Sequence, residues 1–196
     1  MNKFDFENKN VIVTGASMGL GKAIAKAKAN MVIADLNEEE ALKTKAELEV
    51  HGTKIITYTM DVSNYEAFEG LMDRTSKELR SIDILVNNAG IFVTELLVDV
   101  NVNTIDKMIK VNINGIVYGC KAVLPVMQKQ QAGCIINMSS IAAKLGGAGA
   151  AVYSLTIASV LERTACLARE YAKDPINVNT VLPGFVRTPL WGKCVK

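Results

Sequence analysis

The chain has 196 residues, of which 49% are hydrophobic and 21% are charged, and its formal net charge at pH 7 is +2. This length is enough for one domain with a substantial core, and the composition excludes a disordered chain and a highly basic nucleic-acid-binding protein. No stretch of about 18 uncharged apolar residues is present, and residues 1–7 lack the apolar core of a signal peptide. We therefore expect a single cytoplasmic domain over residues 1–196 that neither spans a membrane nor binds nucleic acid.

The cysteines and the histidine exclude some kinds of catalysis. Cys120, Cys134, Cys166 and Cys194 are scattered without a C-x-x-C pair, a pattern that indicates reduced thiols. The one histidine, His51, lies in a polar stretch beside a predicted turn, so we expect it at the surface. A His-based triad and a multi-histidine metal centre are excluded, and no metal site is predicted.

Apolar, β-branched runs alternate with segments of helical pattern along the whole chain. The predicted strands are 10–14, 31–35, 54–59, 83–87, 133–138 and 177–182. The predicted helices are 22–29, 38–51, 64–80, 103–130 and 152–173. Near-continuous hydrophobic strands separated by helices indicate a parallel sheet covered on both faces, and right-handed crossovers give a doubly wound α/β fold of the Rossmann type.

The first predicted strand runs directly into a glycine-rich turn, residues 14–21, with the sequence TGASMGLG. Gly15 permits a tight turn, Gly19 lets a phosphate approach the backbone, and Gly21 lets the next helix pack close to the strand. The unpaired N–H groups at that helix N-terminus favour an anion such as a pyrophosphate. The alternative is a glycine-rich strand–helix joint that binds no ligand.

Polar or turn-forming residues also follow three other predicted strands. Residues 87–90 (NNAG) follow the fourth strand, Ser139 and Ser140 the fifth, and Pro183 and Gly184 the sixth. In an open α/β sheet the ligand crevice lies outside the carboxyl ends of the strands. The sequence therefore predicts that these clusters converge on a ligand site at one edge of the sheet.

Asp35 ends the second predicted strand, where an acidic side chain can accept hydrogen bonds from an adenosine ribose and would repel a 2′-phosphate. No lysine or arginine lies between Thr14 and Gly21 or directly after Asp35, so NAD is favoured over NADP. The alternative is that Asp35 only precedes the next helix, whose predicted cap is Asn37 with Glu40 three residues later.

The chain resembles the short-chain dehydrogenase/reductase family in the order and spacing of its motifs. These motifs are Thr14–Gly21, Asp61–Val62, Asn87–Gly90, Asn112, Ser139–Ser140, Tyr153, and Pro183–Gly184 followed by Thr188. The resemblance implies an oxidoreductase that uses NAD, interconverts a small-molecule secondary alcohol and ketone, and forms a homo-oligomer (dimer or tetramer) through the helices near 103–130 and 152–173. Together with Asp35, the cofactor-binding residues it implies are Gly15, Ser17, Met18, Gly19, Leu20, Gly21, Asp61, Val62, Asn88, Ala89, Gly90, Tyr153, Pro183, Gly184, Val186 and Thr188.

The resemblance also implies catalytic roles for three residues. Tyr153 would act as acid and base, Ser140, thirteen positions earlier, would hold the substrate oxygen, and Asn112 would support a proton-relay water. By residue type alone, other readings stay open. Asn112 would suit a solvated position or a kink in its helix, and the serines, Asp61, Val62 and residues 88–90 would suit strand ends followed by loops and turns.

Position 157 departs from the family pattern Tyr-x-x-x-Lys, since the chain reads Tyr153-Ser-Leu-Thr-Ile157. Residues four apart share a helix face, so the lysine would stand beside the tyrosine. Ile157 supplies no charge, no donor to the ribose and no reason for Tyr153 to ionise below its ordinary pKa of about 10. We therefore expect a large loss of rate. The alternative is a non-catalytic NAD-binding or subunit protein on the same scaffold, and Lys144 is a substitute cation that nothing in the sequence places near Tyr153.

Two lengths also differ from the family pattern. Fourteen positions separate Gly21 from Asp35, which is about four fewer than family members use and corresponds to one missing helical turn. The packing under the second strand and the position of Asp35 are therefore left open. The crossover over residues 15–30 still meets the dozen or so residues that a parallel connection needs. The chain ends at Lys196, soon after Thr188, so we expect that a C-terminal part of the family fold, with a substrate-covering segment and a last strand, is missing.

Overall fold

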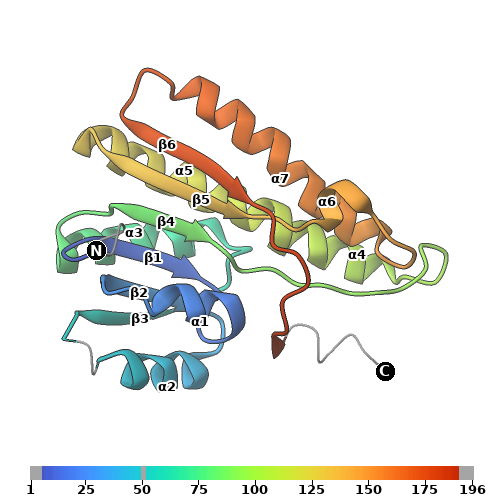
Figure 1. Cartoon of the computed structure of the whole chain (residues 1–196), viewed down its shortest axis with the longest axis horizontal. Coiled ribbons are helices and arrows are strands. Elements are labelled where there is room, and N and C mark those ends of the chain that lie inside the picture. Colours follow the sequence, from blue (N-terminus) through green and yellow to red (C-terminus); the bar gives the residue numbers. More distant parts are fainter. Residues whose placement is uncertain (1–5, 50–51, 190–196) are drawn as a thin grey trace.

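The computed structural model describes residues 6–49 and 52–189, and its centre is a parallel sheet with the strand order β3-β2-β1-β4-β5-β6 (Figure 1). The strands are β1 (Asn10–Thr14), β2 (Asn30–Asp35), β3 (Ile55–Thr59), β4 (Ile84–Asn87), β5 (Gly133–Met138) and β6 (Ile176–Val181). Because every neighbouring pair is parallel, the carboxyl ends of the strands lie at one edge. The doubly wound α/β fold is confirmed, and each predicted strand lies within one residue of its observed bounds.

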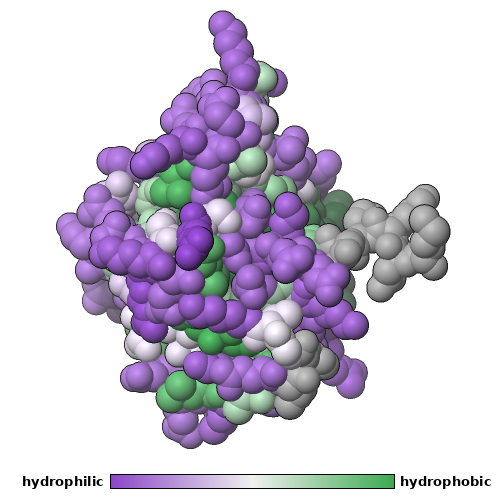
Figure 2. All heavy atoms as spheres, turned by 90° about the vertical axis from the view of Figure 1, so that its left-hand side faces the viewer, coloured by the Kyte–Doolittle hydropathy of each residue, from purple (hydrophilic) through white to green (hydrophobic). Residues whose placement is uncertain are grey.

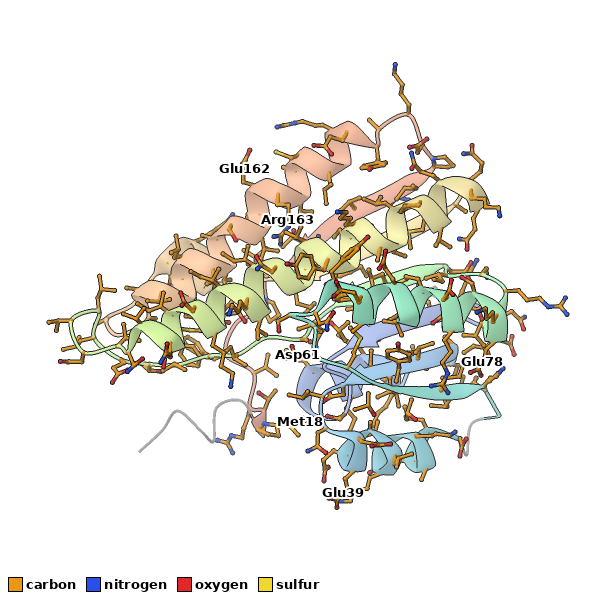
Figure 3. All side chains as sticks on the ribbon, turned by 180° about the vertical axis from the view of Figure 1, so that it is seen from behind. Met18, Glu39, Asp61, Glu78, Glu162 and Arg163 are labelled. Carbon is orange, nitrogen blue, oxygen red and sulfur yellow. The ribbon has the colours of Figure 1, made fainter. Side chains whose placement is uncertain are left out.

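Helices cover both faces of this sheet (Figures 1 and 3). The helices that pack on the sheet are α1 (Gly19–Ala25), α2 (Glu38–Leu48), α3 (Tyr65–Leu79), α5 (Gly115–Gln130) and α7 (Ala151–Glu170). On one face, α1 and α2 bury an apolar core that includes Met31 and Ile33. On the other face, α3, α5 and α7 bury a larger core that includes Phe68, Leu85 and Ile135.

The segment predicted as one helix over 103–130 is three consecutive helical segments. They are α4 (Val102–Met108), the π-helix η2 (Ile109–Asn114) and α5. A π-helical segment inserts an extra residue into an α-helix, and such segments often occur at functional sites. Here the π-helix holds the buried Asn112, whose side chain bonds to the loop after β4. The four-residue helix α6 (Ala142–Leu145) was not predicted, because so short a segment shows no periodicity.

The helix expected over 22–29 begins at Gly19 and ends at Ala25, so its predicted bounds were wrong. It ends early because Ala27 N donates to Ile24 O (3.1 Å), which closes the last turn before the chain leaves for β2. The short crossover still sets β2 in parallel register with β1, from Asn10 opposite Asn30 onward. The fully buried Ala25 and Ala29 are small enough to let the connection pass close to the sheet. Asp35 therefore reaches the carboxyl edge despite the missing turn.

Helix α7 is the one helix in the described ranges that is long and apolar enough to cross a membrane by length and composition. Those two properties are weak grounds, because the core helix of a soluble protein also has them. In this structure Val152, Ile157 and Val160 are buried on α7, which packs against β5 and β6. The expectation of no membrane span stays a prediction.

The amino ends of the central strands are tied together by a polar network. Asn10 donates from Nδ2 to Leu79 O (3.0 Å) and Ser81 Oγ (2.7 Å), and from its backbone N to Asp83 Oδ2 (2.8 Å). Asn30 donates to Asn10 Oδ1 (2.9 Å), which joins β2 to the same network. Figure 2 shows this end of the molecule as a mainly hydrophilic surface with small, separate hydrophobic patches. The network fixes where the strands begin, and the loops at their carboxyl ends are positioned from there.

Arg80 follows α3 with a backbone φ of 71°, in the left-handed region that glycine adopts without strain. Its N–H donates to Ser76 O (3.0 Å), so this conformation ends the helix. We expect Arg80→Gly to raise the free energy of unfolding by about 1 kcal/mol, as measured by urea denaturation. Arg80→Ala keeps the Cβ strain and should bring no such gain. Equal gains from both variants would show that φ is not the cause.

Candidate functional site

The glycine-rich turn between β1 and α1 adopts a conformation that requires its glycines. Gly15 has a φ of 63° and Gly19 a φ of 57°, both in the left-handed region. Gly15 N donates to Ala34 O (2.8 Å), which fastens the turn to β2. At Gly21 a Cβ would overlap Gly15 O and would lie 2.6 Å from Asn88 Nδ2, so the helix packs directly on the turn.

Asn88, for which the family resemblance predicts a place beside the cofactor, uses its side-chain amide to hold this turn. Its Nδ2 donates to Thr14 O (2.9 Å) and to Gly15 O (3.0 Å). In return Thr14 Oγ1 accepts hydrogen bonds from Asn88 N and Ala89 N, both at 3.0 Å. These four bonds join the loop after β4 to the glycine-rich turn. The role of the Thr14 hydroxyl was missed in the sequence, although Thr14 lies within the recognised motif.

Asp35 ties the end of β2 to the same turn. Its Oδ2 accepts a hydrogen bond from Ser17 N (2.9 Å), and its Oδ1 accepts one from Asn37 N (3.0 Å). Each carboxylate oxygen can accept a further bond, and the side chain is only half-buried. Asn37 also caps α2, as predicted, because its Oδ1 accepts from Glu40 N (3.1 Å). Asp35 is therefore held at the site edge with acceptor capacity left over.

The loop after β3 brings Asp61 and Val62 to the same edge. Asp61 is exposed and accepts a hydrogen bond from Ser63 N (2.8 Å), while Val62 is buried. A Cβ on Gly115 would lie 3.0 Å from Val62 Cγ2, so Val62 packs on the start of α5. Figure 3 labels Asp61 and Met18, which lie at this end of the sheet on the loops after β3 and β1.

Asn112 lies in the π-helix and is 1% exposed. Its Oδ1 accepts from Ile91 N (2.8 Å), and its Nδ2 donates to Ile91 O (2.9 Å) and to Thr156 Oγ1 (3.1 Å). Thr156 in turn donates from Oγ1 to Tyr153 O (2.7 Å). The Asn112 side chain therefore connects the loop after β4 to the turn of α7 that carries Tyr153, and its Oδ1 can accept one further hydrogen bond.

Tyr153 and Ser140 lie on segments that are fastened to each other. The Tyr153 ring makes an edge-on contact with Phe92, with 4.5 Å between ring centroids. Ser139 Oγ donates to Ile157 O (3.0 Å), which joins the end of β5 to α7 one turn after Tyr153. Ser140 is half-buried, and its Oγ accepts from Ala142 N (3.2 Å) at the start of α6. The contact of Phe92 was not predicted from the motifs, and Ser139 belongs to the recognised Ser139–Ser140 motif but its bond to Ile157 O was not foreseen.

Position 157 is apolar in structure as well as in sequence. The Ile157 side chain is 6% exposed and packs inside the molecule, while its carbonyl receives the Ser139 hydroxyl. Lys144 lies exposed on α6. Ile157 therefore offers no cation one helical turn from Tyr153.

The segment after β6 crosses the carboxyl edge of the sheet (Figure 1). Pro183 O accepts a hydrogen bond from Ile141 N (3.0 Å), which fixes the start of the segment beside the loop after β5. Farther along, a Cβ on Gly19 would lie 3.4 Å from Thr188 Cβ, so Thr188 reaches the glycine-rich turn. Gly184 and Val186 lie exposed between these two points. The segment thus runs from the loop after β5 to the glycine-rich turn after β1.

The residues at this edge fit a dinucleotide. The Ser17 hydroxyl is buried without a hydrogen-bond partner among the described residues, so it has a donor to give. The missing side chains at Gly15 and Gly21 let the turn pack tightly on residues 88–89 and on itself, whereas a Cβ at Gly19 would meet nothing closer than Thr188 at 3.4 Å, which leaves the backbone there open to another group. Asp35 offers carboxylate oxygens at the position that suits a ribose.

The described cysteines take no part in this site. Cys120, Cys134 and Cys166 are free thiols, and burial raises the pKa of Cys120 to about 11. A thiol with so high a pKa stays protonated at neutral pH and is a poor nucleophile. Cys194 and His51 lie outside the described residues.

Comparison with known proteins shows the family of the chain. The family model for short chain dehydrogenase matches residues 9–196. Cyclopentanol dehydrogenase of Comamonas testosteroni is 34% identical over 187 residues, which cover 93% of this chain and 75% of that protein. 3beta-Hydroxysteroid dehydrogenase 2 of Eggerthella lenta is 34% identical over 186 residues, with 92% and 72% covered. A short chain dehydrogenase/reductase from Burkholderia phymatum, solved in complex with NAD, matches with a TM-score of 0.91 and 27% identity, over 95% of this chain and 69% of that one.

The fold and the site loops thus define a nucleotide-binding α/β protein of the Rossmann type. The chain belongs to the short-chain dehydrogenase/reductase family.

Removing the Asn88 amide should loosen the first turn. Asn88→Ala leaves the carbonyls of Thr14 and Gly15 without their donor, and we expect the free energy of unfolding to fall by about 2 kcal/mol in urea denaturation. The near-isosteric Asn88→Asp places a carboxylate against those carbonyls and should lose at least as much. Asn103→Ala, on exposed α4, is the matched control. Unchanged stability in both Asn88 variants would contradict the bracing role.

Proposed function

We propose that this protein is an oxidoreductase that transfers a hydride between NAD(H) and a small-molecule secondary alcohol or ketone. The observation that carries the proposal is that the glycine-rich turn, Asp35 and Tyr153 come from separate elements and lie at the same carboxyl edge. NAD supplies the hydride chemistry when bound, and the protein supplies orientation and electrostatics. We further propose that residues 1–196 form one dinucleotide-binding domain.

The choice of NAD over NADP rests on charge at the ribose position. Asp35 is fixed by Ser17 N and Asn37 N with its oxygens at the end of β2, and its carboxylate would repel a 2′-phosphate. Residues 14–21 contain no lysine or arginine. Lys22, the next residue, forms an ion pair with Glu47 at 2.7 Å. The NAD complex of the Burkholderia phymatum relative supports the same cofactor.

Proton transfer falls to residues of the loop after β5 and of α7. The Tyr153 hydroxyl would exchange the proton of the substrate alcohol, and the Ser140 hydroxyl would hold the substrate oxygen. Asn112 and Thr156 would keep the Tyr153 turn of α7 in place against the loop after β4. Phe92 would fix the tyrosine ring by its edge-on contact.

Ile157 limits this chemistry. General acid–base catalysis is worth about 10²–10⁴-fold and needs a pKa near the working pH. A buried isoleucine one turn from Tyr153 gives the tyrosine no electrostatic help to ionise. The second candidate function is therefore a non-catalytic NAD-binding or subunit protein, and Ile157 is the observation that favours it.

The proposal also covers the compartment, the partners and the assembly of the protein. We propose a cytoplasmic protein that acts on a small molecule, without nucleic acid or membrane, and that assembles as a homodimer or homotetramer through the helices near 103–130 and 152–173. The free thiols at Cys120, Cys134 and Cys166 support a reducing compartment. The names of the relatives, cyclopentanol and 3beta-hydroxysteroid dehydrogenases, support an alicyclic alcohol as the first substrate to try.

A cofactor titration tests the proposed NAD site. We expect the protein to bind NADH at least about tenfold more tightly than NADPH, because the Asp35 carboxylate repels the 2′-phosphate, as measured by nicotinamide fluorescence. Asp35→Asn removes the charge while keeping an oxygen acceptor, and should narrow that ratio. Asp73→Asn, on the exposed face of α3, should leave it unchanged. Binding of neither nucleotide would overturn the proposal.

Restoring a cation at position 157 tests the catalytic proposal. Ile157→Lys should raise turnover of cyclopentanol with NAD by about 10²–10⁴-fold, because an ammonium group one turn away favours ionised Tyr153. Ile157→Met has similar length without charge and should bring no gain, and Tyr153→Phe should abolish the gain in the lysine variant. Intact NADH binding with no gain in turnover would favour the non-catalytic function.

A further inference from the structure

Helix α2 lies beside α1 on one face of the sheet and contacts the glycine-rich turn through a buried side chain (Figure 1). The residues that α2 buries are Ala41, Thr44 and Leu48, of which Thr44 is the polar one. Thr44 is 0% exposed, and its Oγ1 donates to Ser17 O at 2.8 Å. A threonine within a helix commonly bonds a carbonyl of its own preceding turn. Here the hydroxyl instead bonds a residue 27 positions earlier in the chain.

Ser17 is held on both sides of its Cα atom. Its N–H donates to Asp35 Oδ2 (2.9 Å), and its carbonyl accepts from Thr44 Oγ1. The N–H belongs to the peptide plane before the Cα atom and the carbonyl to the plane after it, so the two bonds restrain both φ and ψ of Ser17. Together they set the direction of the Ser17 Cα–Cβ bond. Thr44 supplies one half of that constraint and Asp35 supplies the other.

The hydroxyl that this arrangement orients has no partner of its own. Ser17 is 1% exposed, and its Oγ makes no hydrogen bond within the part of the chain that the structure describes. The hydroxyl does not cap α1 either, because that helix begins after Met18 without a side-chain cap. A buried hydroxyl without a partner costs free energy. Two hydrogen bonds thus hold in place a group whose own bonding capacity is unused, which indicates a partner from outside the chain.

A second contact from α2 reaches the same segment. Lys22 Nζ forms an ion pair with Glu47 Oε1 at 2.7 Å. Thr44 and Glu47 are three positions apart and therefore share one face of α2. The ion pair is exposed to solvent, and exposed pairs contribute little to stability. The buried bond from Thr44 is therefore the main contact through which α2 fixes the turn.

We propose that Thr44 is a positioning residue for the cofactor, which holds Ser17 O so that the Ser17 hydroxyl can donate to an oxygen of the bound dinucleotide. The inference rests on the NAD site proposed above, and it adds to that site a residue of α2 that lies outside the recognised motifs. Thr44 acts through Ser17. Loss of the Thr44 hydroxyl should therefore weaken nucleotide binding, and should do so only while Ser17 has a hydroxyl to place.

Substitutions at position 44 test this role. Thr44→Val removes the donor at nearly constant volume, so we expect it to raise the dissociation constant of NADH about tenfold, the contribution of about one hydrogen bond, in a nicotinamide fluorescence titration. Thr44→Ser keeps the hydroxyl and should stay within about twofold of the wild type. Thr44→Ala also lacks the donor and serves the same purpose if the valine variant does not fold.

Thr75→Val is the matched control. Thr75 lies on α3, on the other face of the sheet, and is 1% exposed. Its Oγ1 has no hydrogen-bond partner among the described residues, so its loss disturbs no contact with the turn. NADH binding of this variant should equal that of the wild type.

A double-mutant cycle with Ser17→Ala separates positioning of the hydroxyl from general support of the turn. S17A keeps the backbone that Thr44 holds but has no hydroxyl. In the S17A background, Thr44→Val should change the affinity for NADH by less than about twofold, because residues that act through one another have non-additive effects. An equal loss of about tenfold in both backgrounds would show that Thr44 does not act through the Ser17 hydroxyl and would overturn the proposal.

The remaining outcomes are also decisive. Unchanged affinity in Thr44→Val and Thr44→Ala, or the same loss in Thr44→Ser as in Thr44→Val, would show that the Thr44 hydroxyl plays no part in binding. Hydrogen exchange of the Ser17 amide, measured without nucleotide, should be faster in Thr44→Val, and unchanged exchange would show that the bond to Ser17 O restrains nothing. A wild type that binds neither NADH nor NADPH would mark a failure of the proposed cofactor site itself, with which this inference would fall.

Discussion

The hydrogen bonds between Asn88 and the first turn are the constraint on which the rest of the site depends. Gly15 and Gly19 allow the turn its left-handed backbone, but glycine gives freedom and does not choose a conformation. The choice is made by Asn88 Nδ2, which holds the carbonyls of Thr14 and Gly15, while Thr14 Oγ1 holds the backbone of the loop after β4. The loops after β1 and β4 are thereby joined into one hydrogen-bonded unit.

A second set of hydrogen bonds positions the side of the site that carries Tyr153 against these loops. Asn112 lies in the π-helix, where its Oδ1 and Nδ2 both bond to the backbone of Ile91. Its Nδ2 also donates to Thr156 Oγ1 on α7. Ser139 adds a bond from β5 to Ile157. The turn of α7 that carries Tyr153 is thus fixed from two directions by buried polar groups, which rigidify a structure when they are satisfied.

At position 157 the backbone takes part in the framework of the site, while the side chain carries no charge. The carbonyl of Ile157 accepts the hydrogen bond from Ser139 Oγ, so the backbone link between β5 and α7 does not depend on the side chain at position 157. The isoleucine side chain itself supplies no charge one helical turn from Tyr153. Farther along the same helix, Arg163 donates to Ile113 O (3.4 Å), while its Nε and Nη2 are buried without an acceptor among the residues that the structure describes. Helix α7 therefore carries no charge at position 157 and a partly buried guanidinium at position 163.

The sequence by itself determined the strands, their order of appearance and the glycine-rich turn, because hydrophobic runs and glycine spacing act locally. It also predicted the cap at Asn37, which depends on neighbours three residues apart. Only the tertiary structure decided the π-turn at Asn112, the early end of α1, the bracing role of Asn88 and the contact of Phe92 with Tyr153. Each of these depends on groups that lie far apart in the chain and meet only when the sheet has formed, so no local pattern carries them.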